Sequence, residues 1–188
     1  MHLPGLHDGT IRTVSFNPAG TLLATGSDDM SVKLVSVLNG EVIMHLPGLH
    51  EDLIYSIDFN PAGTLLATSA RHDDRSMKLV SVPDGKEVLH LPGLHAGTIF
   101  CVTFNPAGTL LATASDDRSV KLTSVPEGED VLHLPGLHEG SINSVQFNYD
   151  STLLATACAD KSVKLTSVPD GKEVMYLKEL HAATICCV

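Results

Sequence analysis

One unit, repeated almost unchanged along this 188-residue chain, constrains its fold more than any other feature. The block His-Leu-Pro-Gly-Leu-His begins at His2, His45, His90 and His133, so successive copies start 43, 45 and 43 residues apart. An altered fifth version covers residues 176–181. Repetition at this period indicates small supersecondary units, each of which buries its apolar side against its neighbours.

Each unit contains four short apolar runs that are rich in β-branched residues and end at turn-forming residues. In the first unit we expect strands at 10–16, 21–26, 31–37 and 41–46. The sequence Asn-Pro-Ala-Gly at 17–20 suits a tight turn, because proline pre-sets φ and glycine accepts a positive φ. No stretch of the chain sustains a helical period, so we expect strands and turns alone.

The fold class predicted from this pattern is all-β: a β-propeller of four-stranded antiparallel blades, with about four blades and partial strands at both ends. We treat residues 1–188 as a single propeller segment. The expected blades cover approximately 8–47, 51–92, 96–135 and 139–178, and a fifth is expected to start at 182–188.

Ring closure is not decided by the repeats. Residues 2–4 resemble the outer strand of a preceding blade, and residues 183–188 resemble the first strand of a following one. The chain also starts inside a repeat, and we expect no targeting segment. We therefore expect, in this order, a fragment of a larger propeller, a homodimer in which two chains complete one ring, or an irregular four-blade closure.

Composition excludes several classes of partner. The net charge is −10, and no apolar run reaches the length of a membrane span. Binding to phosphates or to an anionic membrane needs a basic face, so we expect a protein or peptide partner with basic groups, no nucleic acid and no membrane. We expect a cytoplasmic protein, with the nucleus left open, because the four cysteines form no recurring disulfide or zinc framework: Cys101, Cys158, Cys186 and Cys187.

The units resemble the WD-repeat (WD40) propeller family, in which a Gly-His pair opens each unit and a Trp-Asp pair closes its third strand. The resemblance implies that histidine, threonine and aspartate form a hydrogen-bonded network within each blade. The residues at the matching positions are His7, Thr25 and Asp29; His50, Thr68 and Asp74; His95, Thr113 and Asp117; and His138, Thr156 and Asp160.

The chain departs from this family at the Trp-Asp pair, because it contains no tryptophan. The four sites read Val35-Ser36, Val80-Ser81, Thr123-Ser124 and Thr166-Ser167. We expect a three-member network in the first two units, and we expect the hydroxyls of Thr123 and Thr166 to replace the indole donor in part. Loss of four large aromatic side chains predicts lower stability than that of a typical family member.

The recurring polar residues are interpreted as structural. Histidine, threonine and aspartate also occur in catalytic triads, but a set present in four copies is explained by a buried network, so we expect no catalytic residue. The spacing of the two histidines in each His-Leu-Pro-Gly-Leu-His block matches no metal motif and contains Pro-Gly. We therefore expect neither a metal nor a cofactor.

Differences between the copies indicate where a partner binds, since residues shared by all blades serve the architecture. The most varied site holds Arg12, Tyr55, Phe100 and Asn143, followed by Cys186 in the fifth copy; by resemblance it opens toward the central channel and the top face. A second varied site follows the turn aspartate, and the second unit has an insertion in the same loop. These sites add Met30, Arg75, Arg118 and Lys161, and the inserted Arg71 and His72.

Tyr55 and Phe100 are predicted to anchor the partner, as aromatic side chains commonly do at interfaces. The alternative is that both rings only fill the space between blades. The predicted function is a non-enzymatic scaffold that binds peptides or proteins on its top face. One alternative is a regulatory or sensor region of a larger signalling enzyme, an NTPase or a kinase, with its catalytic domain outside this chain. Another is recent duplication or engineering without a selected binding function.

Overall fold

The computed structural model describes residues 4–71, 74–168, 170–178 and 183–186. These residues form sixteen strands in four separate sheets, and they contain no helix that could cross a membrane. The first sheet contains β1 (Ile11–Phe16), β2 (Leu22–Ser27), β3 (Val32–Ser36) and β4 (Val42–Leu46). The second contains β5 (Ile54–Phe59), β6 (Leu65–Ala70), β7 (Met77–Ser81) and β8 (Glu87–Leu91). The third contains β9 (Ile99–Phe104), β10 (Leu110–Ser115), β11 (Val120–Ser124) and β12 (Asp130–Leu134), and the fourth contains β13 (Ile142–Phe147), β14 (Leu153–Cys158), β15 (Val163–Ser167) and β16 (Glu173–Leu177).

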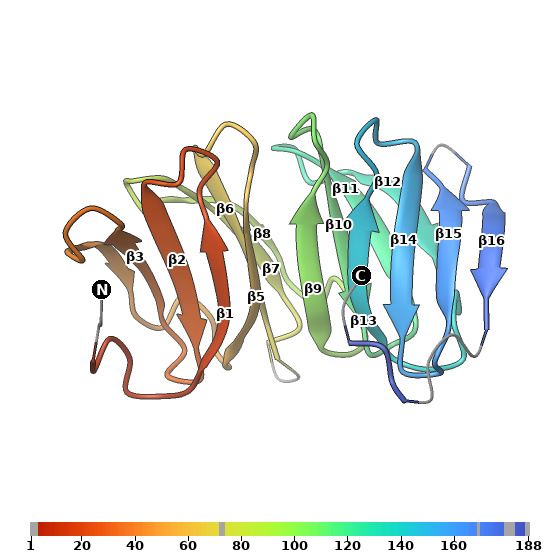
Figure 1. Ribbon diagram of the computed structural model, residues 1–188, viewed down its shortest axis with the longest axis horizontal. Coiled ribbons are helices and arrows are strands. Elements are labelled where there is room, and N and C mark those ends of the chain that lie inside the picture. Colours follow the sequence, from red (N-terminus) through yellow and green to blue (C-terminus); the bar gives the residue numbers. More distant parts are fainter. Residues whose placement is uncertain (1–3, 72–73, 169, 179–182, 187–188) are drawn as a thin grey trace.

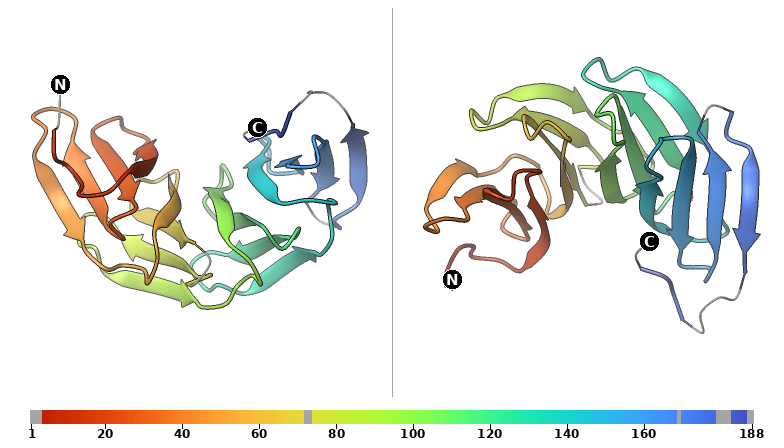
Figure 2. Two further views of the ribbon diagram at one scale, coloured as in Figure 1. Left: turned by 90° about the horizontal axis from the view of Figure 1, so that it is seen from below. Right: turned by 45° about the horizontal axis from the view of Figure 1, so that its top comes forward.

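Each sheet is an antiparallel blade whose strands are ordered in space as they are in the sequence. The predicted all-β propeller architecture is confirmed. The first strands of the blades line the concave side of an arc, and the fourth strands lie on its convex side (Figures 1 and 2). The first strands start, and the second strands end, at the lower edge in Figure 1, which we call the loop edge.

The four blades form an open arc, with the first and fourth sheets at its two ends (Figure 2). Along the arc, β1 packs beside β5, β5 beside β9, and β9 beside β13. The expected irregular four-blade closure is therefore wrong. The expected start of a fifth blade at 182–188 lies partly outside the described residues, and the described part, 183–186, contains no strand.

The turn between the first two strands of each blade is set by an asparagine side chain. In the first blade, Asn17 Oδ1 accepts hydrogen bonds from the backbone N–H groups of Thr21 (2.8 Å) and Leu22 (2.9 Å), and Gly20 has a φ of 67°. In the fourth blade, Ser151 takes this left-handed position with a φ of 62°. The turn therefore survives the loss of Pro and Gly, because the asparagine that organises it is retained as Asn148.

Hydrophobic cores lie between neighbouring blades. Each core combines residues of the second to fourth strands of one blade with the first strand of the next and with residues of its second strand, namely Leu66, Leu111 and Leu154. Between the first two blades, for example, Leu34 and Met44 pack with Ile54, Ile57 and Phe59. Burial of these side chains stabilises the arc by about 25 cal/mol for each Å² of apolar surface removed from water. Every blade therefore depends on a neighbour for its core.

Polar side chains also join the second and third blades on the concave side. Asp58 Oδ2 on β5 accepts hydrogen bonds from Phe104 N (2.9 Å) and Thr103 Oγ1 (3.1 Å) on β9, and Ser56 Oγ accepts one from Val102 N (3.2 Å). Burial raises the pKa of Asp58 above its ordinary value. These bonds could not be predicted from the repeat pattern, because the other units have different residues at the position of Asp58.

Candidate partner-binding surface

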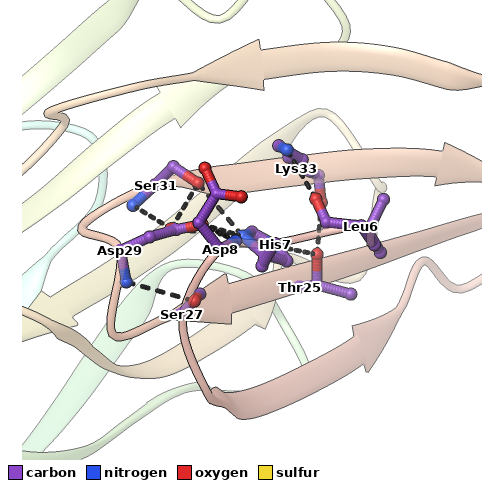
Figure 3. Close-up of polar contacts among 8 residues, drawn as sticks. All are labelled: Leu6, His7, Asp8, Thr25, Ser27, Asp29, Ser31 and Lys33. Carbon is purple, nitrogen blue, oxygen red and sulfur yellow. Dashed lines mark hydrogen bonds and ion pairs between the residues drawn. The ribbon is translucent and has the colours of Figure 1, made fainter. Parts of the chain in front are cut away.

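The polar network of the first blade joins the loop before β1 to strands β2 and β3 (Figure 3). His7 lies between two partners, with Nδ1 2.9 Å from Asp29 Oδ2 and Nε2 2.8 Å from Thr25 Oγ1. Asp29 also accepts hydrogen bonds from Asp8 N (3.0 Å), Ser31 N (3.0 Å) and Ser31 Oγ (2.6 Å). The histidine ring and the aspartate therefore fix the loop edge of the blade.

The same network recurs in the other three blades. The histidine Nε2 lies 2.8 Å from the threonine hydroxyl in each of them. The Nδ1–carboxylate distances are 3.0 Å for His50 and Asp74, 3.1 Å for His95 and Asp117, and 3.4 Å for His138 and Asp160. The residues matched by resemblance are thus brought together in all four blades.

Proton positions in the network follow from its acceptors. An ionised carboxylate only accepts, so Nδ1–H of a neutral histidine donates to aspartate and Nε2 accepts the threonine O–H. Burial lowers the pKa of His95 and His138, which favours the neutral ring. Burial alone would raise the pKa of Asp160, but hydrogen bonds from Ser162 and Glu139 N lower it to about 2. In the third and fourth blades the histidine is therefore neutral and the aspartate ionised at neutral pH.

A serine is the fourth member of each network, a role that the sequence analysis did not assign. The histidine Nδ1 lies within hydrogen-bonding distance of its hydroxyl, at 3.1, 3.1, 2.9 and 2.8 Å in the four blades. The signal was present, because a serine occurs two residues after the aspartate in every unit: Ser31, Ser76, Ser119 and Ser162.

The hydroxyls of Thr123 and Thr166 do not replace the missing indole donor, so that expectation is wrong. Both Oγ1 atoms are buried and have no hydrogen-bond partner in the structure. These threonines point into the apolar space that Val35 and Val80 fill in the first two blades. A buried hydroxyl without a partner costs free energy, because it has lost water and gained nothing.

Replacing Thr123 by valine is expected to raise the free energy of unfolding by about 1 kcal/mol, since valine keeps the shape and removes the unpaired hydroxyl. Thr113→Val in the same blade is the matched control, because Thr113 Oγ1 pairs with His95 Nε2 at 2.8 Å. That variant should lose about 1 kcal/mol or more. Urea denaturation followed by circular dichroism measures both changes, and a loss of stability in Thr123→Val would contradict this assignment.

One network has donor atoms that resemble a metal site. The donor atoms of His138, Cys158 and Asp160 lie within 4.8 Å of one another. Ser27 and Ser115 occupy the Cys158 position in the first and third blades, where each hydroxyl accepts a backbone N–H at 3.1 Å; Cys158 Sγ does the same at 3.3 Å. Burial raises the pKa of the Cys158 thiol to about 11, which disfavours the thiolate that binds metals. These residues fit the structural network.

The most varied sequence site coincides with a β-bulge at the start of each first strand. In all four blades the pairing of the first and second strands skips one residue. A bulged residue is left out of the ladder and its side chain is re-aimed, commonly near functional sites. The skipped residues are Arg12, Tyr55, Phe100 and Asn143.

Three of these four residues line one open hollow on the concave side. Tyr55, Phe100 and Asn143 surround a volume of about 460 Å³ together with Thr184 and Cys186. The two rings meet edge to face, with centroids 5.1 Å apart and an angle of 64° between their planes. All three side chains are only partly buried, so the rings present surface to solvent as well as packing between blades.

Comparison with known proteins agrees with this geometry. The family model for the WD domain, G-beta repeat (WD40), matches the chain at residues 4–36, 40–81, 85–124 and 131–167, which together make up more than half of its length. The chain belongs to the WD40 family. Each WD40 repeat is offset from the sheets by one strand: the match at 40–81, for example, holds β4 of the first blade and β5–β7 of the second. The repeats therefore link neighbouring blades covalently.

Two curated relatives share a short stretch with this WD40 chain. They are the ribosome biogenesis proteins ERB1 of Candida glabrata and Candida albicans, each 51% identical over 37 residues. This stretch is 20% of the present chain, and 5% and 4% of the two relatives, respectively. The chain therefore matches only a small part of these proteins.

The remaining predicted residues that the structure describes do not line this hollow. Arg12 is held by Asp28 through bonds of 2.7 and 2.8 Å, and this contact lowers the pKa of the aspartate. Arg71 is exposed near the loop edge, and its backbone N–H donates to Leu53 O (3.1 Å); His72 lies outside the described residues. The second varied site is a left-handed turn position, and its residues are exposed: Met30, Arg75, Arg118 and Lys161, with φ of 62°, 47°, 68° and 69°.

Proposed function

We propose that this WD40 chain is a non-enzymatic scaffold that binds an extended peptide or a protein loop in the concave hollow. The observation that carries the proposal is the gathering of Tyr55, Phe100 and Asn143, three bulged and varied residues, around one open hollow. The network residues are engaged with one another in every blade, so they serve the fold. The bulged residues take no part in these networks, so they are the ones we assign to recognition of the partner.

The chemistry of the hollow favours a partner with one apolar side chain and nearby basic groups. The ring faces of Tyr55 and Phe100 can contact an aliphatic or aromatic side chain, and aromatic residues dominate binding energy at interfaces. Net charge favours a basic partner, because the chain carries −10. The exposed Arg71 and Arg118 near the loop edge would orient acidic groups of the partner outside the hollow.

An intracellular, cytoplasmic location belongs to the same proposal. It is supported by Cys158 and Cys186, which form no disulfide among the described residues, and by the partial match to ribosome biogenesis proteins. A protein partner is in keeping with WD40 membership. The alternative of a regulatory region attached to a signalling enzyme has no support from the comparisons.

Affinity measurements on two aromatic variants test the proposal. A peptide is first selected from a random 12-residue display library on the wild-type chain, and its binding is then measured by isothermal titration calorimetry. Tyr55→Ala and Phe100→Ala are each expected to weaken binding at least tenfold, as truncation of aromatic hot-spot residues does.

Tyr149→Ala is the matched control, because Tyr149 is fully exposed in the turn between β13 and β14, at the opposite edge of the blade. It should bind like wild type. Melting curves of all three variants establish that they are folded. Equal affinity of the wild-type chain and both aromatic variants would show that the selected peptides bind elsewhere.

A further inference from the structure

The two ends of the arc expose apolar surface that is covered at every other position along it. On β1, Val14 and Phe16 are each 60% exposed, whereas the matching Ile57 and Phe59 on β5 are each 5% exposed. The residues at the same register of β9 and β13 are also buried. The leading face of the first blade, which contains Val14 and Phe16, is thus one half of an inter-blade core without its other half.

The other end of the arc shows the complementary half. Met175 on β16 is 46% exposed, whereas Met44, at the same register of the first blade, is 7% exposed because the second blade covers it. Leu165 on β15 is only partly buried, in contrast to the fully buried Leu34 and Leu122. We call this surface, which contains Leu165 and Met175, the trailing face of the fourth blade.

We propose that the trailing face of one copy of this chain docks on the leading face of a second copy, and that two such contacts close a pair of arcs into one ring. This inference concerns the ends of the arc rather than Tyr55 and Phe100, although docking would displace Thr184 and Cys186, which line the hollow together with those rings.

The structure itself shows what such faces bind. Three times along the chain, a leading face like that of Val14 and Phe16 is covered by a trailing face like that of Leu165 and Met175. A second copy carries this same trailing face, with the same residue types at the same registers. Docking of this trailing face on the exposed leading face would repeat an inter-blade contact that the chain already makes three times. It would need no new kind of contact.

The C-terminal segment, residues 183–186, occupies part of the surface on which the second copy would dock. Ile185 is buried, and its carbonyl accepts a hydrogen bond from Asn143 Nδ2 at 2.9 Å, beside β13. In the repeat, Ile185 corresponds to Ile11, which is exposed at the leading end. Residues 183–186 therefore occupy the position that the first strand of a following blade would take. They must move when β1 of a second copy docks there.

Charge sets how this association depends on salt. Each copy carries −10, so the two repel each other, and added salt screens that repulsion. Apolar contact is not weakened by moderate salt. Association between copies should therefore become stronger as sodium chloride is raised from low to physiological concentration.

Light scattering during size-exclusion chromatography of the full chain tests the proposal. The wild-type chain is expected to approach twice its mass of 19.9 kDa as concentration and salt rise. Phe16→Asp, on the leading face, and Met175→Asp, on the trailing face, should each stay at 19.9 kDa. Both side chains are exposed in the single arc, so each variant is expected to fold. Val174→Asp is the control and should pair like wild type, because Val174 is exposed and the equivalent Ile43 of the first blade stays 47% exposed beside the covered Met44.

Mixing the two variants decides the orientation of the contact. An equimolar mixture of Phe16→Asp and Met175→Asp retains one intact leading–trailing contact, so a two-copy species should reappear in the mixture. Wild-type chain that stays at the mass of one copy would overturn the proposal. Persistent pairing of either single variant, or a wild-type mass that rises beyond two copies, would overturn the closed head-to-tail pair.

Discussion

Replacing Asp117 by alanine is expected to lower the free energy of unfolding by at least about 3 kcal/mol. Its carboxylate accepts hydrogen bonds from His95 Nδ1 (3.1 Å), Ala96 N (2.8 Å), Ser119 N (3.0 Å) and Ser119 Oγ (2.6 Å). Alanine would remove the acceptor that these four donors share, and the His95 ring is buried. Urea denaturation followed by circular dichroism measures the loss.

Asp116→Ala is the matched control for this prediction. Asp116 is exposed, and its carboxylate accepts a hydrogen bond from Ser141 Oγ (2.5 Å) at the surface. Its loss should cost less than about 1 kcal/mol. The loss of unfolding free energy in Asp117→Asn should lie between those of Asp116→Ala and Asp117→Ala. The asparagine amide oxygen still accepts a hydrogen bond, whereas its NH₂ group faces other donors. Equal losses for Asp116→Ala and Asp117→Ala would contradict the role assigned to the network.

The same network predicts how stability depends on pH. Burial lowers the pKa of His95 below 6.5, so the unfolded chain binds this proton at a higher pH than the folded chain does. This contribution to stability is complete above pH 6.5 and is lost as the pH falls through the folded pKa. Hydrogen bonds lower the pKa of Asp117 below 3.8 despite its burial, so its contribution is lost only below pH 3.8. The melting temperature should therefore fall in two stages on acidification.

Phe104→Ala is expected to cost about 3 to 5 kcal/mol, the range for truncating a buried phenylalanine. Phe104 lies on β9 in the core between the second and third blades, where Leu79 and Leu111 are also buried. Truncation would leave a cavity in a core that two blades share. The loss would be seen as a lower urea midpoint for the whole chain.

Phe16→Ala is the natural control, because Phe16 occupies the same register of β1 but lies at the open end of the arc. In dilute solution, where the chain is a single arc, this change should cost less than about 1 kcal/mol. A loss as large as that of Phe104→Ala would mean that Phe16 is buried within the single chain, and the open arc would be contradicted.

The architecture could be predicted because local signals are repeated four times. The asparagine-led turns and the short β-branched runs define each blade, and in the first blade the structure shifts the predicted strand ends by at most one residue. The same repeated signals could not predict that the four blades form an open arc. The leading-face residues Val14 and Phe16 have the same chemical character as their buried counterparts, and exposure depends only on whether a neighbouring blade is present.

The polar network was predicted in part. Histidine, threonine and aspartate were found by resemblance, whereas the serine was overlooked although it recurs at a fixed spacing. Thr123 and Thr166 were assigned a donor role because they occupy the position of a missing indole. Their hydroxyls are buried without a hydrogen-bond partner, so chemical similarity alone misled the prediction.

The candidate site was predicted as a set of varied positions, but its geometry was not. Sequence comparison of the copies selected Tyr55, Phe100 and Asn143, yet the bulge that re-aims them depends on strand pairing. Thr184 joins the hollow because the C-terminal segment lies beside β13, a tertiary arrangement without a local signal. Arg12 was grouped with these residues, although it pairs with Asp28.

Mapping a bound peptide onto the backbone by NMR tests the central claim most directly. The isotope-labelled chain would be titrated with the library-selected peptide, and amide chemical-shift changes would be followed residue by residue. The account predicts that the largest changes lie at the bulges, around residues 54–56, 99–101 and 142–144. Largest changes on the convex outer strands β4, β8, β12 and β16, with the bulges unaffected, would contradict it.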